Sequence, residues 1–406
     1  RFRSDKAFGE AFPANEPEAL KTLKLLVDKY TIRFRKEDVM EEVDPDTLLS
    51  AQLHRLPKKV DVPPEELGDF EMDESQAQAI YEIFLNWKAW TEKYDHYIPK
   101  DEAAEEDHMR QGDTLVKRHA LRQPVNNPAY VASKAEDYKL RKTAEIVERC
   151  LKEGRKVVLF CAYTSQALKY AEYFKEHKPA VYTGLTSKEG EKKDERKEPM
   201  RFKRQAGSHG FKRGWEFDRT GYPKADPRGE TMPALDYERL TFQNAADRKL
   251  MICTYSAGAV GTTFTAGKAM IFDDYPRDVI EDIQAKDRIH RIDPHRQTHH
   301  TVEYFTLRSK YPAAFLERMR KRWVVKQPDG TYEEYRRKAD AEHAAAQLET
   351  EAMTAYETFF AQGTFDQVQS ANLVVQRQAF RLINDGVADE STLRKDEIHF
   401  EGINGS

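Results

Sequence analysis

Short apolar runs recur along the chain from Lys156 onward, and they restrict its possible folds more than any other feature. The first run, Val157–Cys161, is rich in β-favouring residues, which is typical of a strand buried on both faces of a sheet. Four similar runs follow, at Val181–Tyr182, Leu250–Cys253, Ala269–Phe272 and Val302–Phe305. Helical patterns lie between the runs, over residues 166–176, 237–246 and 279–292. Strands that alternate with helices predict an α/β fold with a parallel sheet flanked by helices.

The chain on either side of this α/β part has a different pattern. Residues 1–150 are polar and favour helices, apart from extended breaks at Leu56–Val60 and Pro124–Pro128. After Pro312 the sequence shows long helical patterns, notably over Tyr332–Phe360 and Val368–Ile383. We therefore predict three parts, at residues 1–150, 151–312 and 313–406, in which helical extensions flank the α/β part on both sides.

An insertion, residues 187–235, interrupts the α/β pattern. It carries Gly, Pro and charged residues without apolar periodicity, and aromatic Phe202, Phe211 and Trp215 lie among its basic residues. These basic residues are Arg201, Lys203, Arg204, Lys212 and Arg213. Two interpretations are open: the insertion contacts nucleic acid through these five cations, or it is a solvated and partly disordered loop.

The composition describes a polar, charge-rich chain. Of its 406 residues, 39% are hydrophobic and 33% are charged, and no stretch approaches the roughly 20 consecutive apolar residues of a membrane span. The cysteines, Cys150, Cys161 and Cys253, are too few and too scattered for a disulfide framework or a zinc cluster, which predicts a reducing compartment. The net charge of -4 is compatible with nucleic-acid binding, because basic residues can be grouped locally.

Two segments look like nucleotide-binding motifs but lack what the chemistry needs. Gly261–Ala269 has five residues between its glycines, one more than a phosphate loop, and it leads into an apolar run where a phosphate loop opens a helix. Ala269 also stands where Ser or Thr should hold magnesium. The acidic pair Asp101–Glu102 follows no apolar strand that could aim its carboxylates. The sequence thus offers no credible phosphate loop and no credible magnesium carboxylate of its own.

Three polar residues in the pattern at 279–292 are spaced to share one helical face. Gln284, Arg288 and Arg291 stand at i, i+4 and i+7, while Ile289 and Ile292 turn toward the core. Two guanidinium groups and an amide on one face suit a polyphosphate, because arginine stabilises the charge that spreads over a transferred γ-phosphoryl group. The alternative is a solvated helix whose arginines pair only with neighbouring aspartates.

A Gly-rich segment, Ser256–Thr263, directly follows the apolar run Leu250–Cys253. Small residues there let backbone amides approach a phosphate or a ribose closely, although an ordinary strand-to-helix turn has the same composition. Each of these parts is common by itself. Much rarer is their succession in one chain, namely a strand, a Gly-rich segment, a second strand and then a helix bearing Gln-x-x-x-Arg-x-x-Arg.

Together these segments resemble the second RecA-like lobe of the Swi/Snf-like branch of superfamily two helicases and DNA translocases. The most specific element is Gln284–Ile292, which is similar to the final helicase motif of that branch and includes its Asp-Arg-x-His-Arg core. Ala257–Gly261 looks like the family's Ala-Gly-Gly-Leu-Gly loop. Val157–Thr164 and Tyr182–Gly184 resemble the strands and turns that open the lobe.

Upstream segments extend the resemblance over about residues 23–307. Tyr30–Lys36 and Leu56–Lys59 look like the segment in which the family's first lobe ends. Gln76–Phe84 and Leu121–Pro128 resemble the helical stretch and the Leu-Arg-x-x-x-x-x-Pro pattern that connect the two lobes.

The resemblance implies that the chain is the second motor lobe of an ATP-dependent DNA translocase or helicase, inactive until it is combined with a first lobe. Arg288 and Arg291 would act as arginine fingers on ATP and Mg2+ held by that first lobe, and Gln284 would orient the nucleotide or the attacking water. Gly258, Gly261 and Thr263 would also lie at the nucleotide. The residues implied to face the sugar-phosphate backbone of double-stranded DNA are Thr164, Ser165, Gly184, Ser256, Ala257 and Thr262.

The chain also departs from the family pattern. Ser256 replaces an arginine and Thr263 an asparagine, while Arg277–Asp278 replaces a Trp-Asn pair and Asp293–Pro294 a Gly-Gln pair. These departures affect the detailed DNA contacts and leave the arginines intact. They predict a divergent bacterial or phage member, in an intracellular, cytoplasmic setting in preference to the nucleus.

The missing first-lobe motifs leave two hypotheses. The chain is one part of a two-lobe motor, which the opening Arg-Phe-Arg-Ser without a start methionine favours, or it is a catalytically inactive helicase-like scaffold that binds nucleic acid or a partner. Neither DNA versus RNA nor translocation versus strand separation can be derived from the residues alone.

Overall fold

The computed structural model describes residues 12, 16–30, 66–94, 113–128, 135–195, 197–205, 214–258, 262–289 and 302–385. The chain divides into two compact units, which are described separately below. The sheet unit comprises residues 25–68 and 143–307, and the helical unit comprises residues 1–24, 69–142 and 308–406. Residues 31–36, the segment Leu56–Lys59 and the acidic pair Asp101–Glu102 lie outside the described residues.

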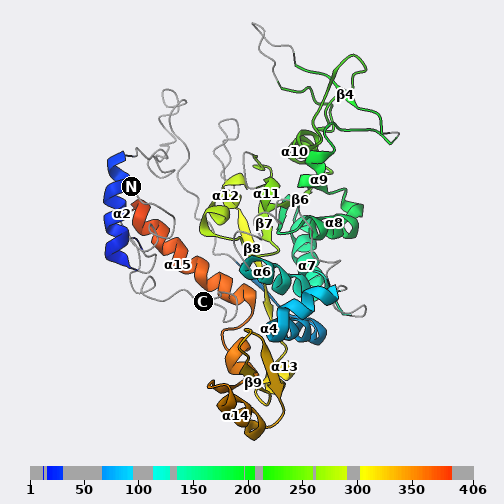
Figure 1. The fold of residues 1–406 in the computed structure, drawn as a ribbon. Helices are drawn as coiled ribbons and strands as arrows, with labels where there is room; N and C mark the ends of the chain where they lie inside the picture. Colours follow the sequence, from blue (N-terminus) through cyan, green and yellow to red (C-terminus); the bar gives the residue numbers. More distant parts are fainter. Residues whose placement is uncertain are drawn as a thin grey trace. The chain divides into compact units, whose positions relative to one another are not determined.

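A six-stranded sheet in the order β1-β8-β7-β2-β6-β3 confirms the predicted α/β fold (Figure 1). The strands are β1 (Glu66–Glu71), β2 (Val157–Cys161), β3 (Ala180–Tyr182), β6 (Leu250–Thr254), β7 (Ala269–Phe272) and β8 (Glu303–Lys310). Every pairing among the five strands from β3 to β8 is parallel, with Phe160 of β2 opposite Cys253 of β6 and Phe272 of β7. Strand β1 was not predicted, because Glu66–Glu71 is acidic and has only two apolar side chains.

The connecting helices cover both faces of this sheet. The helices are α8 (Thr164–Tyr173), a 3-10 turn (Lys175–His177), α9 (Gly184–Lys188), α10 (Ala234–Asn244), α11 (Tyr255–Gly258) and α12 (Val279–Ile289). Strand β2 leads through α8 to β3, whereas the path from β3 through α10 to β6 runs back across the sheet. Because parallel crossovers are right-handed, this reversal puts α8 on one face and α10, α11 and α12 on the other.

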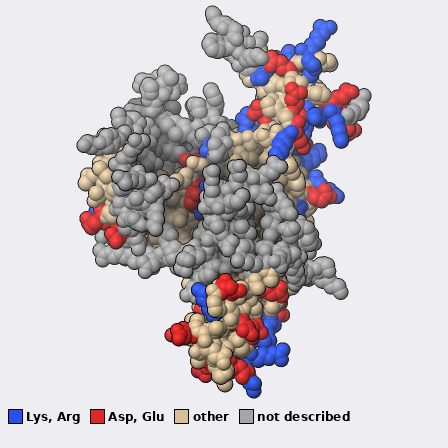
Figure 2. Space-filling model, viewed as in Figure 1, with Lys and Arg blue, Asp and Glu red and all other residues tan. Residues whose placement is uncertain are grey.

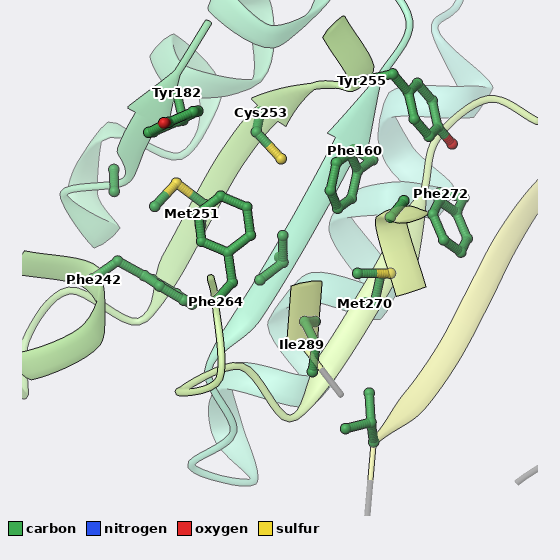
Figure 3. Packing of buried hydrophobic residues seen from close by; sticks show 14 of the residues in the cluster. Phe160, Tyr182, Phe242, Met251, Cys253, Tyr255, Phe264, Met270, Phe272 and Ile289 are labelled. Atoms are coloured by element: carbon green, nitrogen blue, oxygen red, sulfur yellow. The ribbon is translucent and has the colours of Figure 1, made fainter. Parts of the chain in front are cut away.

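The face under α10 and α12 holds a continuous apolar core (Figure 3). Alternate residues of three neighbouring strands point into it, namely Val158, Phe160, Met251, Cys253, Met270 and Phe272. These strand residues are covered by Phe242 of α10, by Ile289 of α12 and by Phe264, which precedes β7. Burying each large side chain contributes about 1.5–3 kcal/mol, so this layer fixes α12 against the sheet.

The insertion is folded over its described residues, contrary to the loop interpretation. It contains the antiparallel pair β4 (Arg201–Phe202) and β5 (Glu230–Thr231), and a bridge between Glu191 and Pro233 closes its base. Phe202, Trp215 and Met232 are buried in a small core of their own. This core packs against Tyr237 and Leu240, so the insertion rests on α10.

Two hairpins of the insertion repeat the same geometry. Bridges join Lys193 to Pro199 and Phe217 to Pro223, and the turns pass through positive φ at Lys197 (64°) and Gly221 (90°). Three backbone bonds also form a closed ring: Lys203 N donates to Lys224 O (2.9 Å), Lys224 N to Glu216 O (2.8 Å) and Glu216 N to Lys203 O (2.9 Å). The ring ties three strands to one another without a wide sheet.

The helical unit is built around aromatic side chains. Its helices are α2 (Pro17–Tyr30, which continues into the sheet unit), α4 (Glu74–Tyr94), α6 (Asp113–Asn126), α13 (Ala313–Met319), α14 (Lys338–Gln347) and α15 (Phe365–Asp385), with a π-helical turn at Tyr356–Phe360. Helix α7 (Tyr138–Lys152) passes from this unit into the sheet unit. Phe84 of α4 stacks on Phe359 at a centroid distance of 5.1 Å, and Phe315 meets Phe360 at 5.2 Å.

The predicted helix over Tyr332–Phe360 is wrong. The segment supplies β10 (Tyr332–Tyr335) and β11 (Ala352–Thr354), which pair antiparallel on either side of β9 (Trp323–Lys326), and only α14 and the π-helical turn are helical. The reason is turn chemistry: Gly330 takes a φ of 83° and Gln327 N donates to Thr331 O (2.8 Å), which folds Pro-Asp-Gly into a hairpin turn. The helix predicted at Val368–Ile383 is confirmed as part of α15.

The extended break expected at Pro124–Pro128 is also corrected. Helix α6 continues through Pro124 to Asn126, and Gln76 Nε2 donates to the Pro124 carbonyl (2.7 Å). A side chain of α4 therefore satisfies a carbonyl in the last turn of α6, where no further helical N–H follows.

Gly258 supplies a test of the packing between α11 and the sheet. A Cβ there would lie 3.0 Å from both Cys253 Sγ and Phe160 Cε1, so Gly258→Ala should lower the free energy of unfolding by about 1–3 kcal/mol. Urea unfolding would measure the loss. Gly184→Ala is the control, because no atom lies within 4 Å of its added Cβ. Equal stabilities of the two variants would contradict the proposed packing constraint.

Candidate nucleotide and nucleic-acid interface

The carboxyl ends of the parallel strands bring most of the predicted contact residues to one edge of the sheet. Thr164 and Ser165 follow β2, Gly184 follows β3, and Ser256 and Ala257 follow β6. Ser165, Gly184 and Ser256 are exposed, whereas Thr164 and Ala257 are half-buried. Open parallel sheets bind ligands at this edge, so the grouping agrees with the predicted role of these residues in backbone contacts.

Local sequence explains how two of these turns form. Thr183 caps α9 by accepting a bond from Thr186 N (3.4 Å), and Thr183 N donates in turn to Thr186 Oγ1 (3.4 Å). Gly184 is exposed in the first turn of this helix. After β6, the Tyr255 hydroxyl donates to the Asp274 carbonyl (2.6 Å). Burial raises the pKa of Tyr255 well above its ordinary value, so the hydroxyl stays a donor.

The Gly-rich segment forms a closed set of contacts with α12. Thr262 Oγ1 donates to the Gly258 carbonyl (2.6 Å), and both residues are buried. Arg288 Nη1 donates to the Thr262 carbonyl (3.2 Å), while Phe264 N donates to the Arg288 carbonyl (2.7 Å). Arg288 and Gly258, predicted to lie at the nucleotide, are therefore joined through Thr262, which was predicted to face the DNA backbone.

The side chains of α12 differ in their exposure to solvent. Gln284 is exposed, but Arg288 is only 8% exposed because its guanidinium group folds onto Thr262. Asp282, one of the aspartates in the alternative of arginine–aspartate pairing, is buried and lies 2.9 Å from Lys286 Nζ. Arg291 and Gly261 lie outside the described residues, so their predicted roles stay predictions.

Gln243, near the end of α10, was not predicted as a site residue. Its Nε2 donates to the Thr263 carbonyl (3.0 Å) and Thr265 Oγ1 (3.3 Å), and its Oε1 accepts from Ala266 N (2.7 Å). One side chain thus holds residues that lie at and just beyond the end of the Gly-rich segment. We call residues 262–266 the distal limb of the Gly-rich loop. No sequence signal marks Gln243, because its partners lie about 20 residues further along the chain.

A buried carboxylate behind this edge was also missed. Asp273, directly after β7, is completely buried and accepts bonds from Thr143 Oγ1 (2.9 Å), the Tyr170 hydroxyl (2.6 Å) and Gln166 Nε2. Asp274 accepts a bond from Ala162 N (3.3 Å). An Asp-Asp pair that ends an apolar run was a usable signal, since a buried carboxylate needs several donors.

Two of the basic residues predicted to contact nucleic acid are paired with acids of the insertion. Lys203 Nζ lies 3.1 Å from Glu216, and Arg204 Nε lies 3.3 Å from Glu230 and stacks on Trp215 at 3.6 Å. Arg201 donates to the Gly229 carbonyl (3.4 Å). Figure 2 shows Lys and Arg mixed with Asp and Glu over this region. Lys212 and Arg213 lie outside the described residues.

A pocket of about 750 Å³ adjoins the insertion, and no residue of the Gly-rich segment lines it. It is lined by Phe217–Tyr222 of the second hairpin, by Asn244 at the end of α10, and by Ala246 and Asp247. Its carboxylates already have partners, since Asp247 accepts from Tyr222 (3.1 Å) and Asp218 from Thr220 (2.6 Å). We therefore place the site at the strand ends and not at this pocket.

Within the described ranges, no three His, Cys, Asp or Glu side chains are placed to hold a metal ion. None of the described helices is long and apolar enough to cross a membrane.

Comparison with known proteins finds no matching family model and no matching curated protein. Solved structures do show similarity. The SWI2/SNF2 ATPase core of Sulfolobus solfataricus is 17% identical, with a TM-score of 0.35 over 76% of this chain and 50% of that chain. The same core in complex with double-stranded DNA is 17% identical, with a TM-score of 0.37 over 76% of this chain and 52% of that chain. The C-terminal part of the Fun30 ATPase domain is 14% identical, with a TM-score of 0.32 over 80% of this chain and 99% of that chain.

The chain therefore spans about half the length of the two Sulfolobus solfataricus cores.

Tyr170 provides a test of the buried network. Burial, and then the Asp273 carboxylate, raise the pKa of Tyr170 well above 10 in the folded chain, whereas an unfolded tyrosine ionises near pH 10. The stability that this group contributes is thus fully present below about pH 10 and is lost as the pH rises further. Tyr170→Phe should cost about 1.5–3 kcal/mol at pH 7 and make the decline above pH 10 shallower.

Urea unfolding from pH 7 to about pH 10.5 would check both effects. Tyr173→Phe is the control, because Tyr173 lies on the same helix and is 52% exposed. If Tyr170→Phe and Tyr173→Phe behaved alike, the hydrogen bond to Asp273 would not contribute as described.

Proposed function

We propose that this chain is the second motor lobe of an ATP-dependent DNA translocase or helicase of the Swi/Snf type. One observation carries the proposal: Arg288 of α12 donates a hydrogen bond to the Thr262 carbonyl in the Gly-rich segment that follows β6. An anion-binding arginine and a backbone-contacting loop are the two parts that such a lobe needs, and here they touch.

The contacts suggest how nucleic acid and nucleotide are coupled. Thr262 bonds to Gly258 on one side and to Arg288 on the other, so a shift of the loop changes the position of the arginine. A guanidinium group has five donors, which lets Arg288 keep its loop bond and bind a phosphate oxygen with others. We assign to Gln284, which is exposed one turn earlier, the role of ordering the nucleotide or the attacking water.

We assign ATP-bound Mg2+ to the first lobe. Asp273 and Asp274, which follow β7, are buried and already accept bonds from protein groups. They do not fit a magnesium site, which needs carboxylates open to water and phosphate. ATP would supply the phosphoryl group, and this chain would supply positive charge and orientation.

The arginines can be tested in the protein combined with a first lobe. Arg291→Ala should lower DNA-stimulated ATP hydrolysis about 10³-fold or more without loss of stability, because an arginine finger acts on the transition state. Arg288→Ala should lower activity and also destabilise the loop, since it removes the bond to Thr262. ATP hydrolysis with and without double-stranded DNA, beside thermal unfolding, measures both effects.

Arg277→Ala is the matched control, because Arg277 is exposed and its guanidinium group pairs with its neighbour Asp278. Hydrolysis undiminished in Arg291→Ala would remove the arginine-finger assignment. No DNA stimulation in the complete protein would leave the inactive scaffold as the function.

The scaffold alternative is favoured by the folded insertion with its own core. It predicts that DNA affinity falls and loses salt dependence when five cations are neutralised by Gln. These are Arg201, Lys203, Arg204, Lys212 and Arg213. Under the motor hypothesis the same variant keeps DNA-stimulated hydrolysis, because Lys203 and Arg204 serve as ion-pair partners inside the insertion.

The control for this variant has the same change in charge at five other exposed cations of the insertion. These are Lys188, Lys193, Lys197, Lys224 and Arg228. Equal DNA affinities of the two variants in a salt titration would contradict a specific role of the first set.

A further inference from the structure

We propose that Gln243 is a positioning residue that fixes the distal limb of the Gly-rich loop for contact with a nucleic-acid backbone. The inference rests on the proposed function and adds to it a residue on α10 that neither the motifs nor the comparisons indicate. It starts from the fact that three hydrogen bonds converge on one half-buried side chain.

The bonds of Gln243 satisfy both ends of its amide. Nε2 donates to Thr263 O and Thr265 Oγ1, and Oε1 accepts from Ala266 N. The three partners lie within residues 263–266. Because the amide both donates and accepts there, it fixes the direction of the backbone over this stretch, which a single bond cannot do. Thr263, implied to lie at the nucleotide, therefore takes its orientation from α10, while Thr262 before it is bonded to Gly258 and Arg288.

The limb is clamped from the opposite side by α12. Phe264 N donates to the Arg288 carbonyl (2.7 Å), and Arg288 Nη1 donates to the Thr262 carbonyl (3.2 Å). The Phe264 ring is completely buried between Phe242 and Tyr182. Gln243 supplies the remaining constraint, because the Phe264 and Arg288 contacts do not hold Ala266.

α10 is itself a firm support. Arg248 donates to Thr241 Oγ1 (2.7 Å) and to the Glu238 carboxylate (2.7 Å), so a buried ion pair fixes the middle of the helix. The ring of Phe202 in the insertion lies 5.7 Å from that of Tyr237. A side chain on a helix held from two directions can position a loop, whereas one on a mobile element cannot.

Hydrogen exchange of the full 406-residue chain tests the clamp without ATP or DNA. In Gln243→Met, which keeps the length of the side chain and removes its polar atoms, the Ala266 amide should exchange about tenfold faster or more. In Gln243→Glu the carboxylate still accepts from Ala266 N, so that amide should stay protected while the donors to Thr263 and Thr265 are lost. Asn244→Ala is the control, since its side chain bonds only within α10, to the Leu240 carbonyl.

Titration of the same proteins with a double-stranded DNA oligonucleotide tests the positioning role. Gln243→Met should weaken binding about three- to tenfold at fixed salt, as expected for loss of one or two phosphate contacts, and Asn244→Ala should bind like the wild type. Unchanged exchange at Ala266 in Gln243→Met overturns the inference. Faster exchange with undiminished binding overturns it too, while the proposed function stands. A wild-type chain that binds no duplex overturns the proposed function and the inference with it.

Discussion

Parallel pairing of β3, β6, β2 and β7 is the constraint on which the rest of the structure depends. It brings four strand ends to one edge, and it requires crossovers that bury both faces of every central strand. All five residues of β2 and of β6 are buried accordingly. The turns that follow these strands are then the places where polar side chains and glycines can face a ligand.

Much of this arrangement was predictable because apolar runs report burial directly. The bounds of β2 and β7 agree with the runs at Val157–Cys161 and Ala269–Phe272, and helix α12 begins at the predicted Val279. The spacing of Gln284 and Arg288 placed both on α12. It could not show that Arg288 turns onto Thr262, because that depends on a loop 26 residues away.

Other features were out of reach of sequence patterns for physical reasons. Tyr332–Phe360 has enough charged and alanine residues to suit a helix, but pairing with β9 supplies a sheet in which Tyr332 and Tyr335 are favourable. The partners of Asp273 come from α7 and α8, over 100 residues earlier, so only the fold reveals that this carboxylate is satisfied. The cellular setting and the bacterial or phage origin stay predictions.

The base of the insertion has a consequence for how such a chain can change. Glu191 and Pro233 face each other across one bridge, and Lys192 N donates to Met232 O (2.8 Å), so the inserted segment leaves and rejoins the sheet unit at a single point. The entropy of closing a loop depends only weakly on its length when its ends are already held together. The first hairpin beyond this base, which the Lys193–Pro199 bridge closes, can thus lengthen or shorten while α10 keeps its place, whereas the second is tied to the segment after α10 by the bond from Tyr222 to Asp247.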